Sequence, residues 1–169
     1  MIFVRNDGAQ AARRTDFDIS YDDGALTVTY TADNSELFCP YSKDNEPLYE
    51  GCVVELFLAE KGDRGSYLEY EFSPCGAVFC GRITYDGAPH LELLPVESIT
   101  HCDIEAYGSG YRVKARITVD IDIDCALFNA YRIECKEGDT AQELFALFPT
   151  KCATFHRPEF MRPLRQYLS

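Results

Sequence analysis

Apolar and polar residues alternate along most of the chain with a period of two, which is typical of half-buried β-strands. The most regular alternation predicts two neighbouring strands at residues 52–58 and 67–72. In the first strand Val54, Leu56 and Leu58 point to one face, and the opposite face carries a carboxylate between apolar side chains. The second strand is divided in the same way. Each strand is therefore expected to place one apolar face in a core and one carboxylate-bearing face outside it.

A β-hairpin is predicted at residues 17–31, where two alternating runs flank the turn sequence Asp22-Asp23-Gly24. Further strands are predicted at residues 77–85, 99–107, 111–119, 127–135 and 144–148, and around residues 91–96. The sequence shows no sustained helical period, no repeat and no linker. It therefore predicts one all-β domain over residues 1–169. The expected architecture is a two-sheet antiparallel β-sandwich, immunoglobulin-like or jelly-roll-like, with about ten strands.

Residues 34–51 are rich in Ser, Asp, Asn, Pro and Glu, and this segment is too long for a tight connection between strands. Aromatic side chains, among them Phe38, Tyr41 and Tyr49, lie within it. Loops that carry aromatic residues on a β scaffold are often binding regions, so this segment is a candidate for part of a functional site.

The charge balance excludes several classes of partner. The 169 residues include 28 Asp and Glu against 16 Lys and Arg, which gives a net charge of −12. Such a chain repels phosphate groups, so neither nucleic acid nor an anionic membrane is expected as a partner. No apolar stretch approaches the ~18 residues of a membrane-spanning helix, and the start Met1–Asp7 becomes polar too soon for a signal peptide. The sequence therefore predicts a cytoplasmic protein.

Common catalytic signatures are missing from the sequence, including GxSxG, HExxH, GxxxxGK[ST] and GxGxxG. The eight cysteines form no CxxC pair and mostly alternate with apolar residues, so we interpret them as structural thiols. His90, His101 and His156 lack a local motif and are interpreted as structural or surface residues. No catalytic residue is predicted on these grounds.

Carboxylates offer two further hypotheses. Glu55, Glu69 and Glu71 share one face of the two central strands, where two of them could approach the separation that a glycosidase uses. The favoured interpretation is instead the solvated face of a sheet in an acidic protein. Alternating Asp residues at 120–124 offer oxygen ligands for calcium, although a solvated strand end is favoured there. A structural calcium ion, there or near residues 33–44, is left open.

Three parts of the chain resemble, in order and spacing, sequence patterns of the carbohydrate-binding module family 9-like domain. Residues 49–58 (YEGCVVELFL) are similar to its D-S-V-E-hydrophobic-F pattern, and residues 67–76 (YLEYEFSPCG) to Y-x-x-F-E-F-N-x-x-G. Near the C-terminus, residues 129–133 (NAYRI) are similar to N-F-Y-R. Residues 148–150 (FPT) and 155–160 (FHRPEF) are similar to W-x-P and F-H-x-P-E-x-F-G. The resemblance covers most of the chain.

The resemblance implies a bacterial β-sandwich that binds sugars, is often attached to glycoside hydrolases and holds calcium in some members. Sugar recognition needs aromatic faces that stack on the C–H face of the ring, and polar groups that pair with its hydroxyls. The candidate ligand-binding residues are Tyr49, Glu55, Glu71, Arg82, Asn129, Arg132 and Phe148. Glu55 matches the acidic position of the first pattern, and Asn129 matches the amide-bearing position of the third.

The sequence departs from the family in its aromatic residues. Sugar-binding members hold the ring between two Trp, whereas this chain has no Trp, and Tyr49 and Phe148 stand about where those residues occur. Glu71 stands where characterised binders use an Arg. The prediction is a non-catalytic carbohydrate-binding protein that acts in polysaccharide breakdown and requires no cofactor. The alternatives are a glycoside hydrolase with paired Glu residues and an interaction module that has lost sugar binding; no oligomeric state is predicted.

Overall fold

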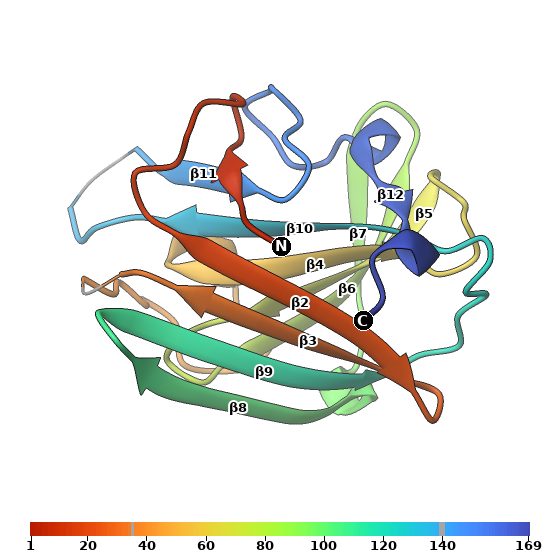
Figure 1. Ribbon diagram of the computed structural model, residues 1–169, viewed down its shortest axis with the longest axis horizontal. Coiled ribbons are helices and arrows are strands. Elements are labelled where there is room, and N and C mark those ends of the chain that lie inside the picture. The colour runs from red at the N-terminus through yellow and green to blue at the C-terminus, as the bar shows by residue number, and fades with distance from the viewer. Residues whose placement is uncertain (35, 139–140) are drawn as a thin grey trace.

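The computed structural model describes residues 1–34, 36–138 and 141–169, which form two antiparallel β-sheets packed face to face (Figure 1). The smaller sheet has the strand order β2 (Thr15–Asp22), β3 (Ala25–Ala32), β9 (Gly110–Thr118) and β8 (Ile99–Tyr107). The larger sheet has the order β1 (Val4–Arg5), β11 (Glu143–Ala146), β10 (Leu127–Glu134), β4 (Val53–Ala59), β5 (Ser66–Phe72), β6 (Val78–Tyr85) and β7 (Pro89–Leu93), and β12 (Arg162–Pro163) pairs with β10. Short 3₁₀ helices are η1 (Leu48–Glu50), η2 (Val96–Ser98), η3 (Pro158–Phe160) and η4 (Leu164–Gln166). The predicted all-β sandwich is confirmed.

The observed strands follow the predicted ones closely. In the hairpin of β2 and β3, Asp22 pairs with Ala25, so Asp23 and Gly24 alone form the turn. Both turn residues have positive φ, 48° and 72°, which suits the twist of a two-residue hairpin. The described residues form twelve strands rather than about ten, because β1 and β12 have only two residues each and show no alternation in the sequence.

The core lies between the two sheets and contains the faces that the alternation assigned to it. Val54, Leu56 and Leu58 of β4 are fully buried in this cluster, as predicted. From the smaller sheet, Phe17 and Tyr30 pack in the same cluster with ring centroids 4.8 Å apart. Because β4 buries every second side chain here, its remaining side chains must point to the outer face of the larger sheet.

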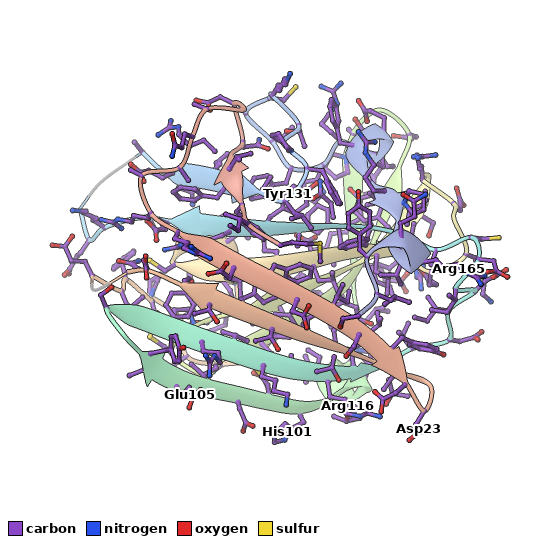
Figure 2. The ribbon with its side chains drawn as sticks, viewed as in Figure 1. Asp23, His101, Glu105, Arg116, Tyr131 and Arg165 are labelled. Carbon is purple, nitrogen blue, oxygen red and sulfur yellow. A yellow bond between two sulfur atoms is a disulfide. The ribbon has the colours of Figure 1, made fainter. Side chains whose placement is uncertain are left out.

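The outer faces of the two sheets differ. On the smaller sheet, His101 and Glu105 of the edge strand β8 are exposed, and Figure 2 shows them at the rim of the molecule. On the larger sheet, Tyr131 is fully buried in a second apolar cluster. The segments before β4 and after β11 contribute Leu48 and Phe155 to this cluster. These two segments therefore cover much of the outer face of the larger sheet.

The cysteines follow the prediction only in part. Cys52, Cys80 and Cys135 are free and buried, as expected of structural thiols. Cys39 and Cys75 form a disulfide with Cα atoms 6.3 Å apart, so the interpretation as unpaired thiols is wrong for this pair. The bond joins the segment before β4 to the turn between β5 and β6.

The Asp-rich run at 120–124 is a loop after β9 rather than a strand end. Asp120 pairs with Lys61 at 3.3 Å, and Asp124 pairs with Arg165. Within the described ranges, no group of three or more His, Cys, Asp or Glu side chains could hold a metal ion. The same part of the chain contains no helix that is long and apolar enough to cross a membrane.

Candidate functional site

A cleft of about 510 Å³ lies on the outer face of the larger sheet. Strands β4, β5 and β6 form its floor. The segment before β4 forms one wall, β7 forms a second, and residues 153–156 form a third. The polar lining residues include Asn45, Tyr49, Glu55, Glu69, Glu71, Gln142, Thr154 and His156. The apolar lining residues include Phe57, Phe79, Ile83, Leu91, Leu93 and Phe155.

Three carboxyl groups stand together on the floor of the cleft. Glu55 of β4 pairs directly with Glu71 of β5, and Glu69 pairs with Phe57 in the same register. Side chains that face each other across antiparallel strands lie within contact distance, so the register alone brings Glu55 and Glu71 together. The relative exposures are 2% for Glu55, 7% for Glu69 and 1% for Glu71. The expectation of a solvated carboxylate face is therefore wrong, because the flanking segments cover this part of the sheet.

Burial changes the ionisation of these groups. It raises the pKa of Glu69 to about 8 and that of Glu71 to about 9, with a further contribution to the latter from the charge of Glu69. Burial also raises the pKa of Glu55 well above its ordinary value, and the charges of Glu71 and Glu69 add to this effect. Since like charges in a desolvated site oppose ionisation, the raised pKa values of Glu69 and Glu71 favour their protonated forms at neutral pH. Protonated carboxyls can both donate and accept hydrogen bonds.

Aromatic and aliphatic side chains surround the carboxyl groups. Phe57 and Phe79 lie on the floor, and Phe155 lies in the wall formed after β11. Leu91 and Leu93 of the edge strand β7 are more than half exposed and line the opposite wall. The cleft thus combines an apolar surface with a few convergent polar groups, as small-molecule sites generally do.

His156 is a cleft residue that the sequence interpretation missed as a site candidate. Its ring stacks on Phe57 with centroids 5.1 Å apart, and its Nδ1 lies 2.8 Å from the hydroxyl of Tyr67. Burial lowers the pKa of His156 to about 4, so the ring is neutral at pH 7. The signal that could have found it is the F-H-x-P-E pattern itself, because that pattern places a His beside the Phe155 that lines the same cleft.

The wall before β4 is fixed by contacts with β6 and with the residue that follows β7. The backbone N–H of Asn45 donates to the carbonyl of Val78 at 2.9 Å, and its side-chain amide donates to the carbonyl of Leu94 at 2.9 Å. The side-chain oxygen of Asn45 accepts the N–H of Cys80 at 3.0 Å. Together with the Cys39–Cys75 disulfide, these bonds hold the segment that carries Tyr49 against the sheet. The cleft is therefore preformed on this side.

Three of the seven sequence-predicted ligand residues line the cleft, namely Tyr49, Glu55 and Glu71. Tyr49 is 49% exposed, so its ring is available to a ligand. Arg82 does not line the cleft, because it pairs with Leu68 and so lies on the opposite face of the larger sheet. There its guanidinium donates to Glu60 at 2.6 Å.

Phe148 and Asn129 hold the segment after β11 and do not line the cleft. The Phe148 ring packs against Phe128 and Tyr167, with centroid distances of 5.6 and 5.1 Å. Asn129 is fully buried; its amide donates to the carbonyl of Phe148 at 2.8 Å, and its oxygen accepts the N–H of Phe148 at 3.1 Å. These contacts position the segment that leads to His156.

Arg132 points into the core between the sheets, because it pairs with Val54 and shares the inner face of the larger sheet. It is fully buried and forms an ion pair with Glu134. Its guanidinium donates to the Thr15 hydroxyl at 2.6 Å and to the Asp33 carbonyl at 2.8 Å. These bonds join the two sheets and place Arg132 away from the cleft.

No family model and no curated protein matches the sequence. The fold is similar to a "putative carbohydrate-binding protein" from Bacteroides uniformis, with a TM-score of 0.72 at 16% identity over 94% of this chain and 83% of that one. It is also similar to a carbohydrate binding module family 9 from Caldicellulosiruptor kristjanssonii. The complex of that module with glucose gives a TM-score of 0.58 at 18% identity, over 96% of this chain and 80% of the module. The complex of the same module with cellotriose gives a TM-score of 0.57 at 19% identity, over 97% of this chain and 75% of that one. At these identities the likeness shows a shared fold, in agreement with the fold that the sequence resemblance implies.

Proposed function

We propose that this chain is a non-catalytic carbohydrate-binding protein whose cleft on the larger sheet holds a mono- or oligosaccharide. One observation carries the proposal: the cleft places the buried carboxyls of Glu55 and Glu71 beside the apolar surface of Phe57 and Phe79. Sugars present both hydroxyl groups and an apolar C–H face, so they match this combination. The complexes of the structurally similar module with glucose and cellotriose support the ligand class.

Each cleft residue has a distinct role in this proposal. The half-exposed ring of Tyr49 stacks on the sugar from the wall before β4. Glu55 and Glu71 hydrogen-bond its hydroxyls from the floor. When the hydroxyl of Tyr67 donates to Nδ1 of His156, the opposite ring nitrogen carries a proton and can donate into the cleft. A Tyr in place of Trp provides a smaller stacking face.

The wider setting belongs to the same proposal. The protein would act in polysaccharide breakdown in a bacterium, in association with glycoside hydrolases, as one domain over residues 1–169. It requires no cofactor and has neither nucleic acid nor a membrane as a partner. A cytoplasmic location stays a prediction, and the Cys39–Cys75 disulfide weighs against it, since such bonds persist in oxidising compartments.

Isothermal titration against a panel of mono- and oligosaccharides, including glucose and cellotriose, tests the sugar site. We expect at least one sugar to bind with a Kd below about 10 mM, which corresponds to roughly −3 kcal/mol. Glu55→Ala should weaken that binding at least about tenfold, since a buried hydrogen-bond partner is lost. Arg82→Ala is the matched control and should change the Kd less than about twofold, because Arg82 lies on the other face of the sheet. Failure of every sugar at 10 mM would refute the proposed function.

The same samples test whether the protein is catalytic. Sugars recovered after prolonged incubation should be unchanged, and aryl glycosides should release no phenol. Release of phenol by the wild-type protein that is lost in Glu55→Ala would contradict the non-catalytic proposal and favour the glycosidase alternative.

A further inference from the structure

The cleft is lined by carboxyl groups, and no cation among the described residues balances them. Glu55, Glu69 and Glu71 line its floor, and no Lys or Arg is among the described residues that line it. The candidate arginine on the neighbouring strand, Arg82, faces the other side of the sheet and pairs with Glu60. Within residues 1–34, 36–138 and 141–169, the three carboxyls therefore share a desolvated site without a positively charged partner.

One carboxyl oxygen on the floor of the cleft has no hydrogen-bond partner within the described part of the chain. Glu71 is 1% exposed, and its buried Oε2 atom is the one that lacks this partner. Buried polar atoms are nearly always paired, so an orphaned oxygen in a lining residue points to a donor supplied by a ligand. The donor must enter through the cleft, because Glu71 is part of its lining.

We infer that the preferred ligand is an amino sugar with a free ammonium group, which Glu55, Glu69 and Glu71 hold on the floor of the cleft. The inference rests on the proposed function and names the class of sugar within it. An ammonium group offers three N–H donors and no acceptor, and so it complements a cluster of carboxyl oxygens better than a hydroxyl does. Its positive charge also permits the carboxyls to ionise in a site where they otherwise repel one another.

The rest of the cleft is compatible with such a cation. His156 is neutral at pH 7, because burial lowers its pKa to about 4, so it does not repel an ammonium group. The faces of Phe57 and Phe79 attract cations as well as the C–H surface of a sugar ring. Burial raises the pKa of Glu71 to about 9, which is the behaviour of a carboxyl whose countercharge is missing.

Titration with matched ligands at pH 7 tests the inference. The ligands are D-glucosamine, D-glucose, N-acetyl-D-glucosamine and cyclohexylamine. Glucosamine should bind at least about tenfold more tightly than glucose, the difference that a charged hydrogen bond provides. N-acetylglucosamine, whose nitrogen is uncharged, and cyclohexylamine, which lacks hydroxyls, should both bind more weakly than glucosamine. Glu71→Gln and, independently, Glu69→Gln should each reduce the ratio of glucosamine to glucose affinity to below about threefold, whereas the exposed control Glu97→Gln should keep it.

Each contrary result has a separate meaning. Equal affinities for glucosamine and glucose would overturn the inference and leave the sugar site intact. Cyclohexylamine that binds as tightly as glucosamine would overturn the amino-sugar ligand together with the proposed function, because hydroxyls would then contribute nothing. A glucosamine preference that survives in both Glu71→Gln and Glu69→Gln would overturn the assignment to these carboxyls.

Discussion

Raising the pH from about 6.5 to about 9 is expected to lower the free energy of unfolding by several kcal/mol. Glu69 and Glu71 have pKa values of about 8 and 9 in the folded protein, against an ordinary value of 4.5. Between pH 4.5 and these values the folded state binds more protons than the unfolded state. Each such proton therefore lowers the free energy of unfolding by about 1.4 kcal/mol for every pH unit, until the pH has risen through the folded pKa.

The other buried titratable groups determine the pH range in which the carboxyls dominate the pH dependence of stability. The pKa of His156 is lowered to about 4, so its contribution has the opposite sign and is confined to pH values below its ordinary pKa of 6.5. The pKa of Cys102 is raised to about 11 from 9, chiefly by burial, so its contribution begins near pH 9. Between pH 6.5 and 9 the buried carboxyls are therefore the main groups that link stability to protons.

Chemical denaturation at several pH values between 6.5 and 9 measures this effect. In Glu71→Gln the free energy of unfolding should fall less steeply with pH than in the wild-type protein. The variant lacks one of the groups that bind a proton in the folded state but not in the unfolded state. The exposed Glu97→Gln should reproduce the wild-type slope, since that carboxyl lies in solvent. A flat profile for the wild-type protein would mean that the cleft carboxyls are solvated and ionised at neutral pH, against the structure.

Arg132→Met is expected to be strongly destabilising without affecting the sugar site. The guanidinium is fully buried, pairs with Glu134 and donates to Thr15 and Asp33. Removing one partner of a buried ion pair lowers the free energy of unfolding by about 3–5 kcal/mol, because the remaining charged and polar groups stay buried without a partner. For a chain of this size, that corresponds to a fall in melting temperature of roughly 10 °C.

Arg82→Met is the matched control for this arginine. Arg82 is about one-third exposed at its side chain and pairs with Glu60, so its loss should cost less than about 1 kcal/mol. Neither variant should change the sugar Kd of the folded protein more than about twofold. A normal melting temperature for Arg132→Met, combined with lost sugar binding, would restore Arg132 as a ligand residue and contradict its structural role.

The strands were predictable because their signal is local. Alternation over seven residues assigned Val54, Leu56 and Leu58 to the core, and the same period placed Glu55 on the opposite face. The pairing of Glu55 with Glu71 follows once the two strands are adjacent and in register. This much of the candidate site is contained in the sequence pattern.

The burial of the site was not predictable in the same way. Whether the outer face of a sheet is solvated depends on segments far away in the chain, such as the Asn45 region bonded to β6 and the segment of Phe155. The alternation in β10 determines which face of the larger sheet carries Arg132. Its partners are Thr15 on the other sheet and Asp33 just beyond that sheet, and these contacts give no local signal in the sequence. A family resemblance carries residue types and not these contacts.

A crystal structure with the tightest-binding sugar of the panel tests the location of the site most directly. We expect the ring to lie in the cleft between Tyr49 and His156, with one of its polar groups about 3 Å from a carboxyl oxygen of Glu55 or Glu71. A sugar bound on the opposite face of the sheet beside Arg82, with the cleft unoccupied, would contradict the cleft as the binding site.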